Sequence, residues 1–329
     1  MNAQARTVLP AADPAVDVSV IVVNYNTAHL LVPMRDALHA ARGALRLQLV
    51  VIDNASRDDS LDVIRRELPE ATLIVNDTNI GFGRANNQAL PLATGRHVLL
   101  LNTDAFVSPD TLVKTVAYLD AHADVGILGV RLTGRDGELQ PSCRRFPTPW
   151  NAFVARAGLV RWLPRTRMVD DMSWDHASVR ECDWVPGCYY LVRREVIAQV
   201  GLFDPRYFLY CEEVDHCRAA KTAGWKVVFY PHTTVVHLGG ESAKTDSALT
   251  PAGKQISVLQ LESELLYFRK HHGVAGLAQA MLLGTLGNLV LALKCLLKAA
   301  PAGLRACWSD SRMRWSLFLR TGFGRRATR

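Results

Sequence analysis

The sequence predicts an α/β fold in which a mostly parallel sheet is flanked by helices. In the first hundred residues, apolar runs of strand length alternate with segments whose apolar residues have helical spacing. The run at 97–101 is apolar at nearly every position, which is typical of a parallel strand covered on both faces. The chain has 329 residues, 49% hydrophobic and 21% charged, enough for one large α/β domain with appendages or for two modest domains.

Four strands separated by helices are expected in the first third of the chain. The strands are predicted at 18–23, 47–52, 71–75 and 97–101, and the helices at 28–41, from Ser56 or Asp58 to 68, and at 84–92. This order implies right-handed βαβ units, so the carboxyl ends of the strands lie along one edge of the sheet.

Polar residues follow three of these strands directly. They are Asn24 and Asn26, Asp53 and Asn54, and Asn102 and Asp104. Because ligands of open α/β sheets bind beyond the carboxyl ends of the strands, we expect these side chains to converge on one cleft. Helix N-caps also favour Asn and Asp, and this structural role explains Asp104 only in part.

The middle of the chain is less regular. A strand at 125–132, a hairpin turn at 134–137, a strand at 189–192 and a helix at 194–200 are predicted. Between Pro141 and His176 the pattern weakens, and we expect a mobile or variable insertion. A helix is expected to begin at the acids Glu212, Glu213 and Asp215, and two β-like runs flank Pro231, the second ending at 237–240.

The C-terminal segment differs in kind from the rest. Residues 257–270 are expected to form a helix, and 274–293 contain no formal charge, which is about the length that spans a bilayer. Nine lysines and arginines and one aspartate follow from Lys294 onward, so this segment carries +8 and the rest of the chain −1. An apolar helix beside a basic, Trp-containing segment favours an interfacial membrane anchor; a spanning helix and simple packing remain alternatives.

Charge and cysteine content exclude some classes of protein. The basic excess lies outside the predicted sheet, which argues against a nucleic-acid-binding domain. The seven cysteines lack the spacing of a zinc site, which favours reduced thiols in a cytosolic protein. Residues 1–15 lack the pattern of a signal peptide and are expected to be a flexible leader.

Five short motifs occur in an order that points to one enzyme family. They are 23–26 (Val-Asn-Tyr-Asn), 51–56 (Val-Ile-Asp-Asn-Ala-Ser), 79–87 (Asn-Ile-Gly-Phe-Gly-Arg-Ala-Asn-Asn), 101–104 (Leu-Asn-Thr-Asp) and 208–215 (Phe-Leu-Tyr-Cys-Glu-Glu-Val-Asp). With Trp184 to Gly187 and His237, the sequence resembles the family 2 inverting glycosyltransferases, and among them the bacterial rhamnosyltransferase-like members.

This resemblance implies a GT-A fold and a nucleotide-sugar donor. We expect a glycosyltransferase domain at 16–250, with a nucleotide-binding half at 16–130 and an acceptor-side half at 131–250. The helical, basic, membrane-associating region follows at 251–329. The expected nucleotide-binding residues are Asn24, Tyr25, Asn26, Asp53, Asn54, Asn79, Gly81, Arg84, Asn102 and Thr103. Asp53 suits a pyrimidine ring because its carboxylate can accept the imide N–H.

The resemblance also implies a divalent cation, Mg²⁺ or Mn²⁺, bound by Asp104 and His237. Asn102 occupies the first acidic position of the family's usual Asp-X-Asp motif, so the diphosphate would supply several ligands. Glu213 is expected to be the general base, with Glu212 and Asp215 as alternatives. Trp184, Gly187 and Tyr210 are expected on the acceptor side, although Trp184 could equally be a core residue.

The leading expectation is therefore an inverting enzyme that transfers rhamnose from dTDP-rhamnose to a lipid-linked or cell-envelope glycan. It would be a peripheral protein on the cytoplasmic face of the membrane, and a homo-oligomer is possible. The alternatives are a galactofuranosyl- or N-acetylhexosaminyltransferase that uses a UDP-sugar, and a non-catalytic nucleotide-sugar-binding relative. A nicotinamide dehydrogenase is disfavoured because the glycines follow the third strand and not the first.

Overall fold

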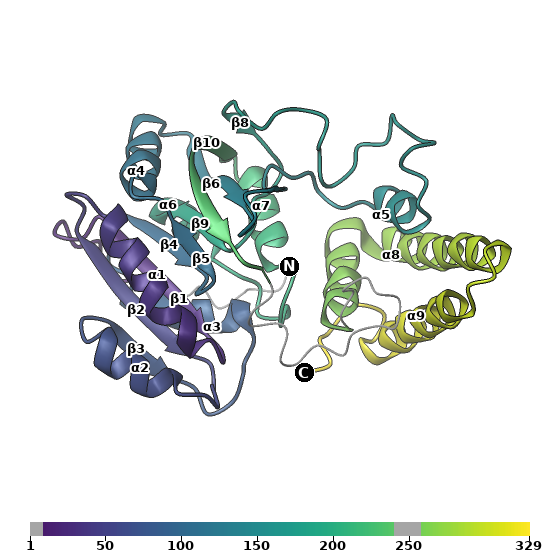
Figure 1. Ribbon diagram of the computed structural model, residues 1–329, viewed down its shortest axis with the longest axis horizontal. Coiled ribbons are helices and arrows are strands. Elements are labelled where there is room, and N and C mark those ends of the chain that lie inside the picture. Colours follow the sequence, from purple (N-terminus) through teal and green to yellow (C-terminus); the bar gives the residue numbers. More distant parts are fainter. Residues whose placement is uncertain (1–8, 240–257) are drawn as a thin grey trace. The chain divides into compact units, whose positions relative to one another are not determined.

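The computed structural model describes residues 9–239 and 258–329. The chain divides into two compact units (Figure 1). The first consists of Met1–Arg144, Asp170–Pro205 and Glu212–Thr245, and the second of Arg145–Val169, Arg206–Cys211 and Asp246–Arg329. Residues 1–8 of the expected leader and the expected boundary at 250/251 lie outside the described residues.

A mixed sheet forms the centre of the first unit. Its described strands run in the order β3-β2-β1-β4-β9-β6-β10-β5, with β7 paired to β6 and β8 to β10. The strands are β1 (Val18–Asn24), β2 (Leu47–Asp53), β3 (Thr72–Val75), β4 (His97–Leu101), β5 (Ala105–Val107), β6 (Val125–Thr133), β7 (Leu139–Gln140), β8 (Arg180–Glu181), β9 (Tyr189–Arg193) and β10 (Lys226–His237).

The sheet is parallel in its first half and mixed in its second. Strands β3, β2, β1 and β4 run parallel to one another, and β6 pairs in parallel with β10. Strand β9 lies antiparallel between β4 and β6, and β5 is antiparallel to β10. The buried apolar residues of β1, β2 and β4 explain this position, because a central parallel strand is covered on both faces.

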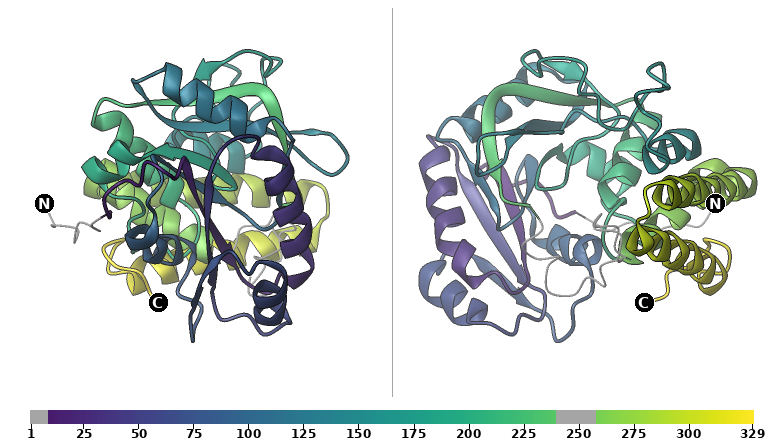
Figure 2. Two further views of the ribbon diagram at one scale, coloured as in Figure 1. Left: turned by 90° about the vertical axis from the view of Figure 1, so that its left-hand side faces the viewer. Right: turned by 45° about the vertical axis from the view of Figure 1, so that its right-hand side comes forward.

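Helices cover both faces of this sheet (Figure 2). Helices α1 (Ala28–Ala41), α2 (Ser60–Glu67) and α4 (Thr111–Ala121) bury Leu31, Met34, Ile64, Leu112 and Val116 in one apolar core with β1 and β2. Helices α3 (Phe82–Ala89), α6 (Arg194–Val200) and α7 (Glu212–Thr222) contact strands from the other side, and a short 3₁₀ helix, η1 (Leu90–Leu92), follows α3.

Most predicted elements are present, with three differences. The two runs predicted around Pro231 form one strand, β10, whose pairing with β6 shifts register between Tyr230 and Thr234. Pro231 has no N–H to donate, so it is accommodated where the ladder is interrupted. The structure adds β5 and α4, which were not predicted. In the expected insertion it places α5 (Pro149–Arg156), capped by reciprocal bonds between Thr148 and Asn151.

The second unit consists mainly of helices. α5, α8 (Val258–Leu297) and α9 (Pro301–Arg320) pack together, and α8 and α9 lie side by side in both views of Figure 2. The predicted helices at 257–270 and 274–293 are the two parts of α8, which bends at Gly273 (φ 67°). A small apolar core of Phe153, Val154 and Ala157 joins α5 to α8.

Candidate active site

Hydrogen bonds connect the carboxyl ends of the three strands that were predicted to converge. Asn24 at the end of β1 donates through Nδ2 to Asp53 Oδ1 at the end of β2 (2.9 Å). Thr27 Oγ1 donates to Asn24 Oδ1 (2.7 Å) and lies 2.9 Å from Thr103 Oγ1, just beyond β4. These four side chains are buried. The structure therefore brings Asn24, Asp53 and Thr103 together at one edge of the sheet.

The backbone above this edge has an unusual conformation. Asn26 (φ 54°) and Ala55 (φ 69°) both lie in the left-handed region, which residues other than glycine rarely adopt. Ser56 holds both turns, because its Oγ accepts from the Asn26 N–H (3.0 Å) and its own N–H donates to Asp53 Oδ2 (3.0 Å). Such strained, over-determined turns occur preferentially at functional sites.

Several residues expected to bind the nucleotide hold loops in place in the structure. Asn54 Nδ2 donates to Asn79 Oδ1 (2.9 Å), and Asn79 Oδ1 also accepts from the Gly81 N–H (3.0 Å). Gly81 has φ 90° at the start of α3, a conformation that favours glycine. Arg84 Nε donates to the Pro205 carbonyl (2.7 Å), so the guanidinium is partly engaged by the protein itself.

Asp104 and His237 lie beside each other, at the ends of neighbouring segments β5 and β10. His237 Nε2 is 3.6 Å from Asp104 Oδ1. Gln140 fixes the imidazole, because its Nε2 donates to the His237 carbonyl (2.8 Å) and its Oε1 therefore accepts from Nδ1–H (3.0 Å). Burial lowers the pKa of His237, and the Arg144 charge adds to this against the opposing effect of Asp104.

This pair fits a divalent cation. A neutral imidazole with the proton on Nδ1 directs the Nε2 lone pair toward a carboxylate oxygen, and two electron-rich atoms facing each other are suited to share a cation. No group of three His, Cys, Asp or Glu side chains with metal-binding geometry lies within residues 9–239 and 258–329. Two protein ligands agree with Mg²⁺ or Mn²⁺ sites in which phosphate oxygens and water supply the rest.

Glu213 lies in the first turn of α7, and one of its carboxylate oxygens has no hydrogen-bond partner among the described residues. Its Oε2 is buried and makes no hydrogen bond with the described residues. Burial raises the pKa of the Glu213 carboxyl, and the backbone amides of Glu213, Gly187 and Val214 and the Arg144 guanidinium act in the opposite direction. A carboxylate with a raised pKa and a free oxygen is the arrangement expected of a general base that works near neutral pH.

Arg144 acts on both of these groups, although no pattern in the sequence singled it out. Its guanidinium lies 4.8 Å from the centroid of the Trp184 ring and pairs with Asp170 Oδ1 (2.9 Å). Its charge acts on both Glu213 and His237. Trp184 is buried, with this guanidinium over its ring. Arg144 therefore supplies a positive charge that acts on both the Glu213 carboxyl and the His237 imidazole.

Cys188 lies within the same cluster. Burial, together with the charges of Asp104 and Glu213, raises the pKa of its thiol to about 12. Its carbonyl accepts from the Asn102 N–H (3.0 Å), which ties the Asn102–Asp104 segment to the start of β9. Asp104, His237, Arg144, Glu213 and Gly187 are thus brought into one site on the first unit.

The remaining predicted residues have varied positions. Glu212 and Asp215 are buried in the first turn of α7, and Tyr25 follows β1. Tyr210 belongs to the second unit, where Tyr210 (φ 71°) and Cys211 (φ 68°) form a strained connection directly before α7.

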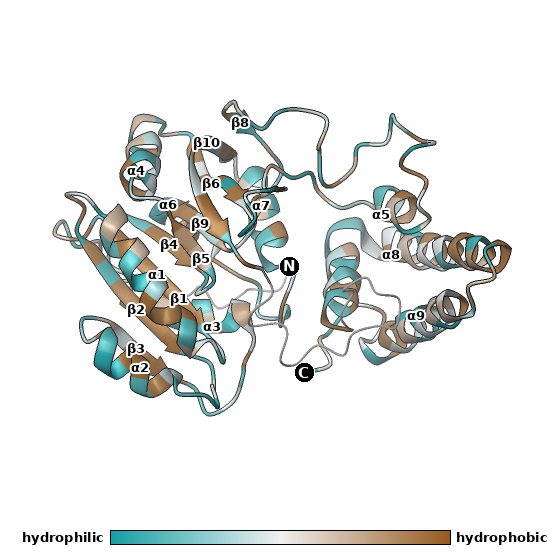
Figure 3. Ribbon diagram, viewed as in Figure 1, coloured by the Kyte–Doolittle hydropathy of each residue, from teal (hydrophilic) through white to brown (hydrophobic). Residues whose placement is uncertain are grey.

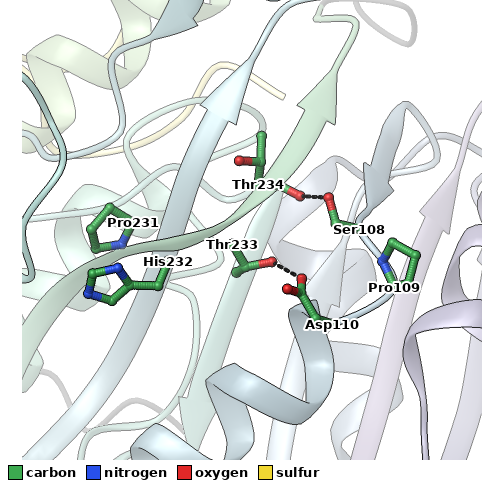
Figure 4. Close-up of a pocket in the computed structure, with 7 residues that line it drawn as sticks. All are labelled: Ser108, Pro109, Asp110, Pro231, His232, Thr233 and Thr234. Carbon is green, nitrogen blue, oxygen red and sulfur yellow. Dashed lines mark hydrogen bonds between the residues drawn. The ribbon is translucent and has the colours of Figure 1, made fainter.

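A separate pocket lies between the start of α4 and the irregular part of β10 (Figure 4). Its volume is about 640 Å³. Thr233 Oγ1 donates to Asp110 Oδ1 (2.7 Å) and Ser108 Oγ donates to the Thr234 carbonyl (2.7 Å). None of the predicted site residues lines it, and these bonds join α4 to β10, so the pocket has a structural explanation.

The family model described as "Glycosyltransferase like family 2" matches residues 14–255, which is most of the chain and includes all the motifs above. The predicted resemblance is therefore confirmed.

Two curated relatives are rhamnosyltransferases. The N-acetylglucosaminyl-diphospho-decaprenol L-rhamnosyltransferase of Mycobacterium tuberculosis is 27% identical over 215 residues, 61% of this chain and 70% of that protein. The rhamnosyltransferase WbbL of Escherichia coli is 26% identical over 165 residues, 48% of this chain and 60% of that protein.

Solved structures confirm the GT-A fold. A mannosyltransferase from Pyrobaculum calidifontis, PcManGT, has a TM-score of 0.52 and 20% identity, over 95% of this chain and 89% of that chain. TarS from S. aureus has a TM-score of 0.51 and 16% identity, over 93% and 92%. At these identities the likeness concerns the fold alone.

Proposed function

This chain belongs to glycosyltransferase family 2 and is a hexosyltransferase, and from that premise we propose that it transfers rhamnose from dTDP-rhamnose, with inversion, to a lipid-linked or cell-envelope glycan. The observation that carries the proposal is the cluster of Asp104, His237, Arg144 and Glu213 beside the bonded strand ends. Two relatives named as rhamnosyltransferases support the choice of sugar.

The strand ends are the proposed nucleotide site. Asp53 has a buried carboxylate whose oxygens each retain a free lone pair after the bonds from Asn24 and Ser56. A uracil or thymine ring offers an imide N–H to such an acceptor, whereas adenine offers no donor flanked by two carbonyls. This arrangement supports a pyrimidine nucleotide, dTDP or UDP.

Asp104 and His237 are the proposed ligands of a divalent cation. When bound, such a cation neutralises negative charge on the leaving diphosphate. Arg144 adds a positive charge close to His237, which favours the same negatively charged diphosphate. Gln140 keeps the imidazole of His237 in the tautomer that has a free Nε2.

Glu213 is the proposed general base. Its unpaired Oε2 accepts the proton of an acceptor hydroxyl as the hydroxyl oxygen bonds to the anomeric carbon. The bond between that carbon and the diphosphate oxygen breaks in the same displacement, so the anomeric configuration inverts. Arg144 stabilises the ionised form of Glu213 against the effect of burial.

A membrane-facing location on the cytoplasmic side is part of the proposal. The window of α8 with the highest mean hydropathy, 1.9, is only 28% buried, and α8 is the one helix of the described chain long and apolar enough to cross a membrane. The basic residues that follow α8 suit an anionic lipid surface better than a full span.

Donor binding tests the proposed function most simply. Thermal unfolding of the full chain would be measured with dTDP-rhamnose, UDP-galactofuranose, UDP-N-acetylglucosamine and GDP-mannose, each with and without Mn²⁺ or Mg²⁺. We expect metal-dependent stabilisation by dTDP-rhamnose. Stabilisation by a UDP-sugar alone would favour the alternative donor. That alternative is supported by relatives named as the N-acetylglucosaminyltransferase TarS, which are 28% identical over 154 residues. Stabilisation by GDP-mannose or by none would contradict the pyrimidine site.

A further inference from the structure

The helices of the second unit bury a polar network beside their apolar core and expose several large apolar residues. Arg156 of α5 donates through Nη1 to Asp310 Oδ2 of α9 (2.6 Å) and to Asn288 Oδ1 of α8 (2.9 Å), and all three are largely buried. Asn288 Nδ2 also donates to Asp310 Oδ2 (2.7 Å) and Ser311 Oγ (2.8 Å). This network joins the three helices through their interior.

The outer surface of the same helices carries large apolar side chains. Leu289 is 62% exposed, Leu293 58% and Trp308 77%. Figure 3 shows hydrophobic residues concentrated on the half of α8 that leads into α9. In a water-soluble helix pair the apolar residues face inward, whereas helices in contact with lipid keep their charged groups inside and paired.

A groove runs between α8 and α9 on this surface. Its volume is about 790 Å³, which is within the range of ligand pockets. Its walls include Leu289 and Ala292 of α8 and Leu304, Trp308 and Trp315 of α9. These residues give the groove a mostly apolar lining, which suits a hydrocarbon chain.

Two arginines add positive charge to the groove. Arg305 and Arg312 line it and are exposed, and because they are seven residues apart on α9 they lie on one face of the helix. Asp310, the one acid of α9, pairs with Arg156, so among the described residues no carboxylate neutralises either arginine. Two free guanidiniums beside an apolar groove complement a molecule that joins an anionic phosphate to a long apolar chain.

We propose that the groove between α8 and α9 binds one anionic phospholipid, with an acyl chain along the apolar walls and the phosphate on Arg305 and Arg312. The inference goes beyond the transfer reaction and rests on the membrane-surface location proposed with it. Trp308 and Trp315 suit this position, because indole rings favour the boundary between headgroups and chains.

A soluble short-chain phosphatidylglycerol is the probe that tests the groove without a membrane. Its binding to the full chain would be measured by calorimetry below its micellar concentration, with the matching phosphatidylcholine as the neutral control. We expect one phosphatidylglycerol to bind and the R305Q/R312Q double variant to bind it at least tenfold more weakly. The matched control is R325Q/R326Q, which removes the same charge outside the groove and should leave the affinity unchanged. Equal loss in both double variants would overturn the proposal.

A second pair of variants separates the groove from general hydrophobic adsorption. Ala292→Phe fills the groove while adding apolar surface, and Leu282→Phe places the same phenyl ring at an exposed position of α8 outside it. The proposal requires that A292F abolish phosphatidylglycerol binding and that L282F retain it. Binding by A292F at the wild-type level would overturn the proposal. Circular dichroism and thermal unfolding would establish that both variants are folded.

Other occupants of the groove give different results. Binding of a short isoprenyl diphosphate in place of phosphatidylglycerol would identify a lipid-linked substrate and contradict the phospholipid assignment. A dimer in analytical ultracentrifugation that A292F dissociates, with no phosphatidylglycerol binding by the wild type, would assign the groove to a second copy of the chain. Donor binding in the thermal-shift panel does not depend on either result, so failure here leaves the proposed reaction intact.

Discussion

The two units of this chain differ in the polar groups that they bury and the apolar groups that they expose. The first unit buries Val20, Leu99 and Leu128 in its sheet and places bonded polar side chains, such as Asn24 and Asp53, at the carboxyl ends of the strands. The second unit buries Arg156 and Asp310 and leaves Leu289 and Trp308 exposed. The first unit therefore offers polar groups to the proposed nucleotide, and the second offers the apolar surface that we propose contacts lipid.

The largest expected effect is on the chemistry of the first unit. Glu213→Gln removes the proposed base and should lower kcat about 1,000-fold, with donor affinity nearly unchanged. The control is Glu195→Gln, which changes an exposed acid in the first turn of α6. Steady-state kinetics and donor titration would measure both. Turnover retained by E213Q would contradict this assignment and would leave Glu212 or Asp215 as the candidate base.

Glu213→Gln should lower activity but raise the stability of the fold at neutral pH. Because burial raises the pKa of Glu213 in the folded protein, ionisation there opposes folding as the pH rises above the value of an ordinary glutamate. E213Q should therefore unfold at a higher temperature than the wild type at neutral pH, and the difference should disappear at acid pH. Lower stability of E213Q at neutral pH would show that the charged form is favoured in the fold.

The interior network of the second unit gives the next largest effect. Asp310→Ala leaves the Arg156 guanidinium buried without its carboxylate and should cost about 3 kcal/mol of unfolding free energy. Asp36→Ala, which removes an exposed carboxylate paired with Arg35, should cost less than 1 kcal/mol by the usual value of a surface pair, about 0.5 kcal/mol. Denaturant titration followed by tryptophan fluorescence would compare them. Equal costs would mean that the network contributes no more than a surface pair.

Arg144→Ala tests whether the first unit has one electrostatic site. We expect kcat/KM to fall roughly 30-fold, which corresponds to about 2 kcal/mol for a lost charge-assisted contact. The activity of the wild type should decline as the pH falls through the raised pKa of Glu213, and in R144A this decline should begin at higher pH, because Arg144 lowers that pKa. Arg135→Ala, in the exposed β6–β7 turn, is the control. If the pH dependence of R144A activity matched that of the wild type, Arg144 would not lower the pKa of Glu213, and the idea of one electrostatic site would be contradicted.

The smallest effect concerns the orientation of one imidazole. Gln140→Leu removes the partner that fixes His237 and should weaken Mn²⁺ binding about tenfold, as for other residues that orient metal ligands. Gln199→Leu, which removes a hydrogen bond to Trp225, should leave it unchanged. Titration with Mn²⁺ in the presence of the donor diphosphate would measure both. Unchanged binding by Q140L would contradict the assignment of His237 as a ligand.

The regular part of the first unit could be predicted because its signals are local. Apolar runs bounded by polar residues marked β1, β2 and β4, and helical spacing marked α1 and α6. Strand β5 has only three residues, and α4 contains threonines and valines that suit strand and helix alike. These two elements depend on contacts with β10 and β6 and so could not be read from local pattern.

Residues of the candidate site could be proposed from the sequence only where they stand at the end of a strand or the start of a helix. Asp53, Asp104 and Glu213 stand at predictable ends of elements. Arg144 lies in an irregular segment among several arginines, and only the backbone pairing of Arg144 with Trp184 brings it to the cluster. The polar network inside the second unit could not be predicted either. The sequence shows an apolar helix, but it does not show which face of that helix contacts Arg156.

The anomeric configuration of the product tests the central claim most directly. NMR spectroscopy of the glycoside formed by the full chain from dTDP-rhamnose and a short-chain lipid-linked acceptor would determine it. Direct displacement with Glu213 as the base predicts a product whose anomeric configuration is opposite to that of the donor. A product that retains the donor configuration would contradict the account.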